Sequence, residues 1–176
     1  NNSGGFFVAL IQKKADANSV CAHTESGAAR EDSPLCADLW QRYGLSDDVR
    51  QQYKLYASSR GTFAVSADFT PPPGIKLDAQ GVMIKKAKCR YPKFSTAGAM
   101  LWGQQAGCYV LDLSKEQCQA YVSRTNTSWP TAVVPGFYMV RYRGIVLGTA
   151  QIKQQDNCAL LQSLYPKEWV GCLGAK

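Results

Sequence analysis

Residues 136–153 (GFYMVRYRGIVLGTAQIK) constrain the fold more than any other part of this chain. They form two runs of strand length, 136–142 and 145–153, which are separated only by Arg143-Gly144. This spacing predicts a β-hairpin with a two-residue turn, and therefore an antiparallel pair within a larger sheet. Gly148 is expected to let another part of the backbone approach the second strand closely.

Shorter segments predict the rest of the fold. The PPPG segment at 71–74 excludes regular structure, and Ser114 is a suitable N-cap for a short helix. Further strands are expected at 62–66, 82–88, 99–102 and 109–113, and two short helices within 38–56. Many short strands with one or two helices between them, over about a hundred residues, predict an α+β fold with a small mixed β-barrel.

Positive charge is concentrated in the second part of the chain. The net charge is +7, and residues 79–176 carry twelve lysines and arginines against four acids, whereas residues 1–78 carry eight against nine. Such an asymmetry is typical of a surface that faces a polyanion such as nucleic acid or an anionic membrane. The alternative interpretation is a basic face that only maintains solubility.

The densest basic stretch is VMIKKAKCRYPKF at 82–94, which holds no acidic residue. On a strand, alternate cations would share one face at a spacing close to that of successive phosphates. Tyr91 and Phe94 could stack on unpaired bases or complete the core. The cations of this stretch are Lys85, Lys86, Lys88, Arg90 and Lys93, of which Lys86, Lys88 and Arg90 would share a face.

The predicted hairpin is a second acid-free basic segment. It carries Arg141, Arg143 and Lys153. These three side chains are candidate contacts to RNA phosphates, and the alternative is an ordinary hairpin with a basic tip.

Cysteine usage predicts a reducing compartment inside the cell, the nucleus or the cytoplasm. The seven cysteines are scattered without a C-x-x-C pair, which favours free thiols. No metal site is predicted, because His23 is the only histidine. No nucleotide-binding or hydrolase motif is present, and Cys89 is interpreted as structural, so no catalytic residue is assigned. The apolar run 6–11 is far shorter than the roughly 20 residues that a bilayer requires, so no membrane contact is expected.

Three segments, taken in order, resemble one family. They are GGFFVALIQKK (4–14), DLWQRYGLSDDV (38–49) with GVMIKKAK (81–88), and RGIVLGTAQIK with the later LYPKEW (within 143–169). They are similar to the RNA cytosine-5 methyltransferases of the Sun/Nop (RsmB/RsmF-like) family, which methylate tRNA or rRNA with S-adenosylmethionine. In that family the first segment resembles the closing strand of the catalytic domain and the last resembles a PUA-like domain.

The resemblance implies three parts: residues 1–14 as the last strand of a Rossmann-like methyltransferase sheet, 15–35 as a linker, and 36–176 as a PUA-like RNA-binding region. This region would position structured RNA, tRNA or rRNA, for the preceding methyltransferase domain, and Lys167 in the Tyr-Pro-Lys segment would be a further RNA contact. S-adenosylmethionine would be bound by the parent enzyme. None of the seven cysteines follows a proline or threonine, as the family's catalytic cysteines do, so this chain alone is not expected to methylate RNA.

Two other classes of function stay open from the sequence. A protein-interaction module would present an apolar patch around Trp129 or Trp169 and would not bind RNA in a salt-sensitive way. A secreted pilin- or adhesin-like domain would pair its cysteines in disulfide bonds.

Overall fold

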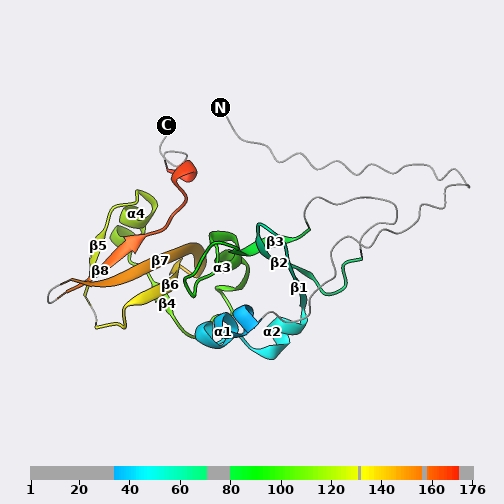
Figure 1. Cartoon of the computed structure of the whole chain (residues 1–176). Coiled ribbons are helices and arrows are strands. Elements are labelled where there is room, and N and C mark those ends of the chain that lie inside the picture. Colours follow the sequence, from blue (N-terminus) through cyan, green and yellow to red (C-terminus); the bar gives the residue numbers. More distant parts are fainter. Residues whose placement is uncertain (1–33, 71–79, 131, 156–157, 171–176) are drawn as a thin grey trace, which may run out of the picture.

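The computed structural model describes residues 34–70, 80–130, 132–155 and 158–170 (Figure 1). They form a three-stranded and a five-stranded sheet, which lie on either side of α3 in Figure 1. The first part of the chain holds α1 (Pro34–Tyr43), α2 (Asp47–Gln51), β1 (Tyr53–Ala57), β2 (Gly61–Ser66), β3 (Val82–Lys86) and α3 (Thr96–Trp102). The second part holds β4 (Val110–Asp112), α4 (Lys115–Val122), β5 (Thr127–Trp129), β6 (Gly136–Tyr142), β7 (Ile145–Gln155), β8 (Cys158–Ser163) and the 3₁₀ helix η1 (Lys167–Trp169).

The predicted hairpin is confirmed and forms the centre of the five-stranded sheet. The strand order is β4-β6-β7-β8-β5, and the sheet is mixed because β4 runs parallel to β6. Arg143 and Gly144 have φ angles of 51° and 76°, as in the tight turns whose twist matches that of the two strands. A β-bulge between Val140 and Arg141 shifts the pairing of the two strands by one residue.

Alternate residues of β6 face two different hydrophobic cores. Tyr138 and Val140 belong to a core under α4, whereas Met139 between them belongs to a core under α1 and α3. This is the ordinary alternation of a strand whose sheet is covered on both faces. The sheet therefore separates the two cores and contributes side chains to both.

Helix α4 covers one face of the five-stranded sheet. It begins with the predicted N-cap, because the Ser114 hydroxyl accepts a hydrogen bond from the Gln117 N–H and the Gln117 side chain accepts one from the Ser114 N–H. Tyr121 is fully buried, and its hydroxyl donates to the Thr149 carbonyl at 2.9 Å. The Ser163 hydroxyl donates to the Tyr121 carbonyl at 2.6 Å, so α4 is fixed to both β7 and β8.

The other face is covered by α1, α3 and the antiparallel three-stranded sheet, whose strand order is β1-β2-β3. Buried aromatic rings fill the space between them, with 4.6 Å between the ring centres of Trp40 and Trp102. Arg42 of α1 joins this core to the other sheet, because its guanidinium lies 3.7 Å from the Tyr109 ring centre and donates to the Phe137 carbonyl. The two sheets thus contribute side chains to one core, which α1 and α3 complete.

Two predicted strands differ in the structure. Residues 99–102 belong to α3 and not to a strand, because the Ser95 hydroxyl accepts a hydrogen bond from the Gly98 N–H and starts a helix at Thr96. The strand predicted at 82–88 ends at Lys86, where the Cys89 N–H donates to the Lys86 carbonyl and closes a turn. The cations after Lys86 therefore lie in a loop and do not alternate on a strand.

The sequence reading also missed three strands. The two helices expected within 38–56 are present as α1 and α2, but Tyr53–Ala57 is β1, which pairs with β2 and stacks Tyr56 on Phe63. Strands β5 and β8 were not predicted, and they complete the mixed sheet. The curled five-stranded sheet with its short helices confirms an α+β fold with a PUA-like half-barrel. The strand expected at 1–14 and most of the linker expected at 15–35 lie outside the described residues.

Gly148 and Gly144 both lie in the hairpin, but their surroundings differ. Its φ is +138°, and a Cβ there would lie 2.9 Å from the Tyr121 hydroxyl and 3.1 Å from the Thr96 methyl group. The close neighbours are side chains, not the backbone that the sequence suggested. Gly144 also has a positive φ, but a Cβ there would meet nothing within 4 Å.

We therefore expect Gly148→Ala to lower the free energy of unfolding by about 2–3 kcal/mol, through backbone strain together with steric overlap. Gly144→Ala should cost about 1 kcal/mol, because it adds only the left-handed strain. Urea unfolding followed by tryptophan fluorescence measures both values. Equal losses in the two variants would show that the contact with α4 and α3 contributes nothing.

Candidate nucleic-acid interface

The loop between β3 and α3, residues 87–95, carries the basic stretch onto the five-stranded sheet. Its two ends are fixed, since the Ala87 N–H donates to the Arg60 carbonyl and the Ser95 N–H donates to the Ile84 carbonyl. Phe94 is buried and anchors the loop in the core. The cations of this loop are therefore held on a defined part of the surface.

A hollow of about 300 Å³ lies where the loop meets the sheet and the C-terminal segment. Lys86 and Lys93 line it, together with residues of the 164–168 segment that include the acid Glu168. Hydroxyl groups contribute much of the remaining lining. The residues that line the hollow are Lys86, Cys89, Lys93, Phe94, Ser95, Thr96, Thr149, Leu164, Pro166 and Glu168.

The loop also packs against Phe137 near the start of β6. The ring centre of Tyr91 lies 5.1 Å from that of Phe137, and the Lys93 amine lies 5.1 Å from the same Phe137 ring. Phe137 pairs with Gln151 on β7, so their side chains stand on one face of the sheet. Lys153 is two residues further along β7 and shares that face.

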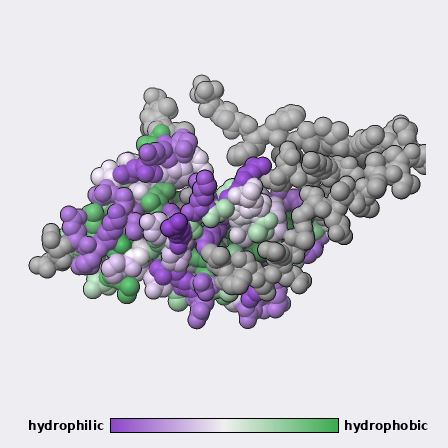
Figure 2. All heavy atoms as spheres, viewed as in Figure 1, coloured by the Kyte–Doolittle hydropathy of each residue, from purple (hydrophilic) through white to green (hydrophobic). Residues whose placement is uncertain are grey.

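We call this surface the loop face. It comprises Lys86, Lys88, Arg90, Tyr91, Lys93, Gln151 and Lys153, together with the buried Phe137 ring against which Tyr91 packs. Figure 2 shows hydrophilic residues over much of the described surface, with the apolar residues in small separate patches.

Like charges meet on the loop face. Burial holds the pKa of the Lys93 amine below its usual range, the charge of a Cys89 thiolate opposes this, and the charge of Lys86 lowers the pKa further. Within the described residues, no ion pair links Lys86, Lys88 or Arg90 to an acid. A bound anion would therefore relieve repulsion that the fold itself leaves in place.

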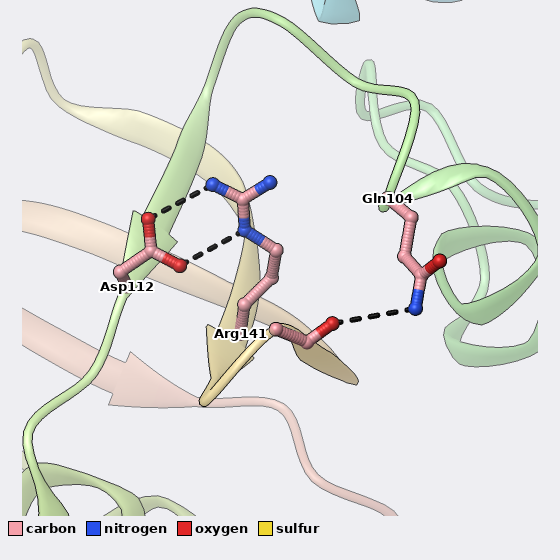
Figure 3. Close-up of polar contacts among 4 residues, drawn as sticks. Gln104, Asp112 and Arg141 are labelled. Carbon is pink, nitrogen blue, oxygen red and sulfur yellow. Dashed lines mark hydrogen bonds and ion pairs between the residues drawn. The ribbon is translucent and has the colours of Figure 1, made fainter.

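The other residues predicted to contact RNA lie outside the loop face. Lys85 is only 6% exposed, on the buried side of β3, so its side chain is not part of the loop face. Arg141 makes a double ion pair with Asp112, with distances of 2.8 and 2.9 Å, which joins β4 to β6 (Figure 3). Arg143 is exposed at the hairpin tip and lies over the Tyr142 ring at 5.3 Å. Lys167 is exposed in η1, between two residues that line the hollow.

Two members of the loop face, Phe137 and Gln151, were not among the RNA contacts predicted from the sequence. Counting outward from the Arg143-Gly144 turn would pair Phe137 with Ala150, but the β-bulge moves the pairing to Gln151. The bulge has no clear sequence signal. The position of Phe137 beside Gly136, at the start of the predicted strand, was a signal that could have drawn attention to it.

The features expected of the two rival classes can be located. Cys89, Cys108, Cys118 and Cys158 are free thiols. Trp129 packs half-buried against the core under α4, and Trp169 is 41% exposed with its ring 5.6 Å from Tyr165. No helix in the described part of the chain is long and apolar enough to cross a membrane.

The fold, a curled mixed sheet with helices on both faces, is that of a PUA-like domain. Residues 108–170, from the start of the five-stranded sheet to η1, match the family model of the PUA domain of the methyltransferase RsmF. This supports a PUA-like domain of the RsmF/Sun type. A comparison of the chain with curated proteins gave no match.

The charge environment of Lys93 gives a direct test of the loop geometry. Lys86→Met should raise the pKa of Lys93, because a positive neighbour that disfavours the charged amine is removed. Lys88→Met is the matched control, because it removes the same charge from a side chain that does not act on Lys93. Proton titration of isotopically methylated lysines by NMR reports the pKa, with Lys93→Arg assigning the signal. A pKa that does not rise in Lys86→Met, or rises equally in both variants, would contradict the arrangement.

Proposed function

We propose that this chain is the RNA-binding region of an S-adenosylmethionine-dependent RNA 5-methylcytosine methyltransferase that acts on tRNA or rRNA. The loop face holds the RNA through its phosphates, and the PUA-like sheet supports that face. Contacts of this kind fix the register of the RNA while chemistry takes place on another domain. The proposal also implies an intracellular compartment where RNA is modified.

The observation that carries the proposal is the convergence of cations from separate parts of the chain. Lys86 and Lys93 come from the β3–α3 segment and line one hollow, and Lys153 comes from β7 on the adjoining face of the sheet. The match of residues 108–170 to the RsmF PUA domain supports RNA as the polyanion. Arg141 is left out, because its guanidinium is already paired with Asp112, and Lys85 is left out because it is buried.

No residue of this chain is proposed to bind the methyl donor or to attack cytosine. The family's chemistry uses cysteines that follow proline or threonine, and the residues before the seven cysteines here are of other types. S-adenosylmethionine and the attacking thiolate would be supplied by a methyltransferase domain that acts together with this region.

Charge reversal tests the loop face. Binding of a labelled structured RNA, measured by fluorescence anisotropy, should weaken steeply as salt rises, because released counterions drive the association. The double variant Lys86→Glu/Lys88→Glu should bind more weakly to every RNA sequence, and the slope of log affinity against log salt should fall by about 2.

The matched control is Lys54→Glu/Lys115→Glu. Both lysines are exposed, one on β1 and one at the start of α4, and the net charge changes by the same amount. We expect this variant to keep the slope of the parent protein. If both double variants weaken binding equally, the effect is one of overall charge and the loop face is not the site. If the parent protein does not bind RNA at low salt, the proposed function is wrong.

A further inference from the structure

Tyr91 is the one large aromatic side chain of the β3–α3 loop that is left in solvent. It is 59% exposed, whereas Phe94 of the same loop is buried. One part of the Tyr91 ring rests against Phe137 at 5.1 Å and an angle of 48°, which limits its orientation without covering it. A large ring with this exposure gains nothing for the core, so its packing against Phe137 leaves a preoriented flat surface facing outward.

Two cations and an amide lie near this ring, either in sequence or through Phe137. The Lys93 amine lies over the Phe137 ring on which Tyr91 rests, and Arg90 is the residue before Tyr91. Gln151 stands beside Phe137 as its cross-strand partner. No hydrogen bond within the described residues uses the Gln151 side chain, so its amide can both donate and accept toward a ligand.

We propose that Tyr91 is a stacking platform for an unpaired base, with Lys93 at the adjoining phosphate and Gln151 reading the edge of the base. The inference rests on the proposed function and narrows the substrate to RNA that presents at least one unpaired nucleotide at the loop face. Stacking on an aromatic ring requires a base whose face is open, which a paired base within a helix does not offer. An amide beside the ring can form two hydrogen bonds to one base edge, which selects among bases.

The stacking step is tested with two RNAs of the same composition, a short unpaired oligonucleotide and a blunt-ended, fully paired duplex. Tyr91→Ala should weaken binding of the unpaired RNA about tenfold and leave binding of the duplex nearly unchanged. Tyr91→Phe keeps the ring and its contact with Phe137, so it should bind the unpaired RNA like the parent protein. Phe69→Ala removes another exposed aromatic side chain, outside the loop face, and should affect neither RNA.

The outcomes distinguish failure of the stacking platform from failure of the proposed function. If Tyr91→Ala weakens both RNAs equally, or neither, while Lys86→Glu/Lys88→Glu still weakens both, then RNA binding stands and the stacking platform is wrong. If the parent protein binds neither RNA, the proposed function fails and the platform fails with it.

The role of Gln151 has its own readout. We expect the parent protein to rank the four homopolymeric RNAs by affinity, and Gln151→Leu to reduce the spread between them without changing the salt dependence. Gln154→Leu is the control, because Gln154 lies further along β7 and is exposed. An unchanged spread in Gln151→Leu would overturn the assignment of Gln151 as the residue that reads the base.

Discussion

Alternation along β6 sends neighbouring side chains into opposite cores, and the rest of the described structure depends on this arrangement. Met139 completes the aromatic core under α1 and α3, and Val140 completes the core under α4. Each core lies on one face of a single sheet, so neither half of the described chain can be removed without exposing apolar area on the other. The boundaries of the family match, 108–170, therefore do not coincide with a unit that buries its own surface. Residues before 108 are part of the same packing, and they carry the loop that places cations on the sheet.

The position of that loop follows from how its ends are held. Ser95 both caps α3 and donates from its hydroxyl to the Met83 carbonyl at 2.5 Å, so the start of the helix is tied to β3. A Cβ on Gly98 would lie 3.0 Å from the backbone of Ile84, which shows how closely α3 packs on that strand. Seven loop residues between two fixed points have little freedom to withdraw from the sheet. The electrostatic repulsion between Lys86 and Lys93 is thus built in by hydrogen bonds and packing, at some cost that a bound phosphate would offset.

Local patterns predicted the parts of the fold that depend on neighbouring residues. The hairpin around Arg143-Gly144 and the capping box at Ser114 were both readable, because turn and cap chemistry is confined to a few positions. Residues 99–102 were wrongly predicted to form a strand. Their apolar side chains suit a strand as well as a helix, and the N-cap that starts the helix lies upstream at Ser95. The sequence identified the cations, but it did not show which of them remain free to contact RNA in the folded protein. Lys85 is buried by the sheet, Arg141 is paired with Asp112 across two strands, and the bulge beside Val140 decides which side chain stands next to Phe137. All three depend on strand pairing over long distances in sequence, which a local pattern does not encode.

Arg141 on β6 and Lys93 in the β3–α3 loop carry the same charge in different surroundings. Arg141 donates from its Nε and Nη2 to the two carboxylate oxygens of Asp112, so the charge that a phosphate would meet there is already balanced by a carboxylate (Figure 3). Lys93 has no acid partner among the described residues; it rests on a ring and faces another lysine. An ammonium in such a place is disfavoured in its charged form and gains more from an incoming phosphate than a fully hydrated lysine would, because part of its desolvation has already occurred on folding. A basic surface becomes a binding site in proportion to the charge that the fold leaves unpaired, and by that measure we expect RNA to bind at the loop face rather than at Arg141.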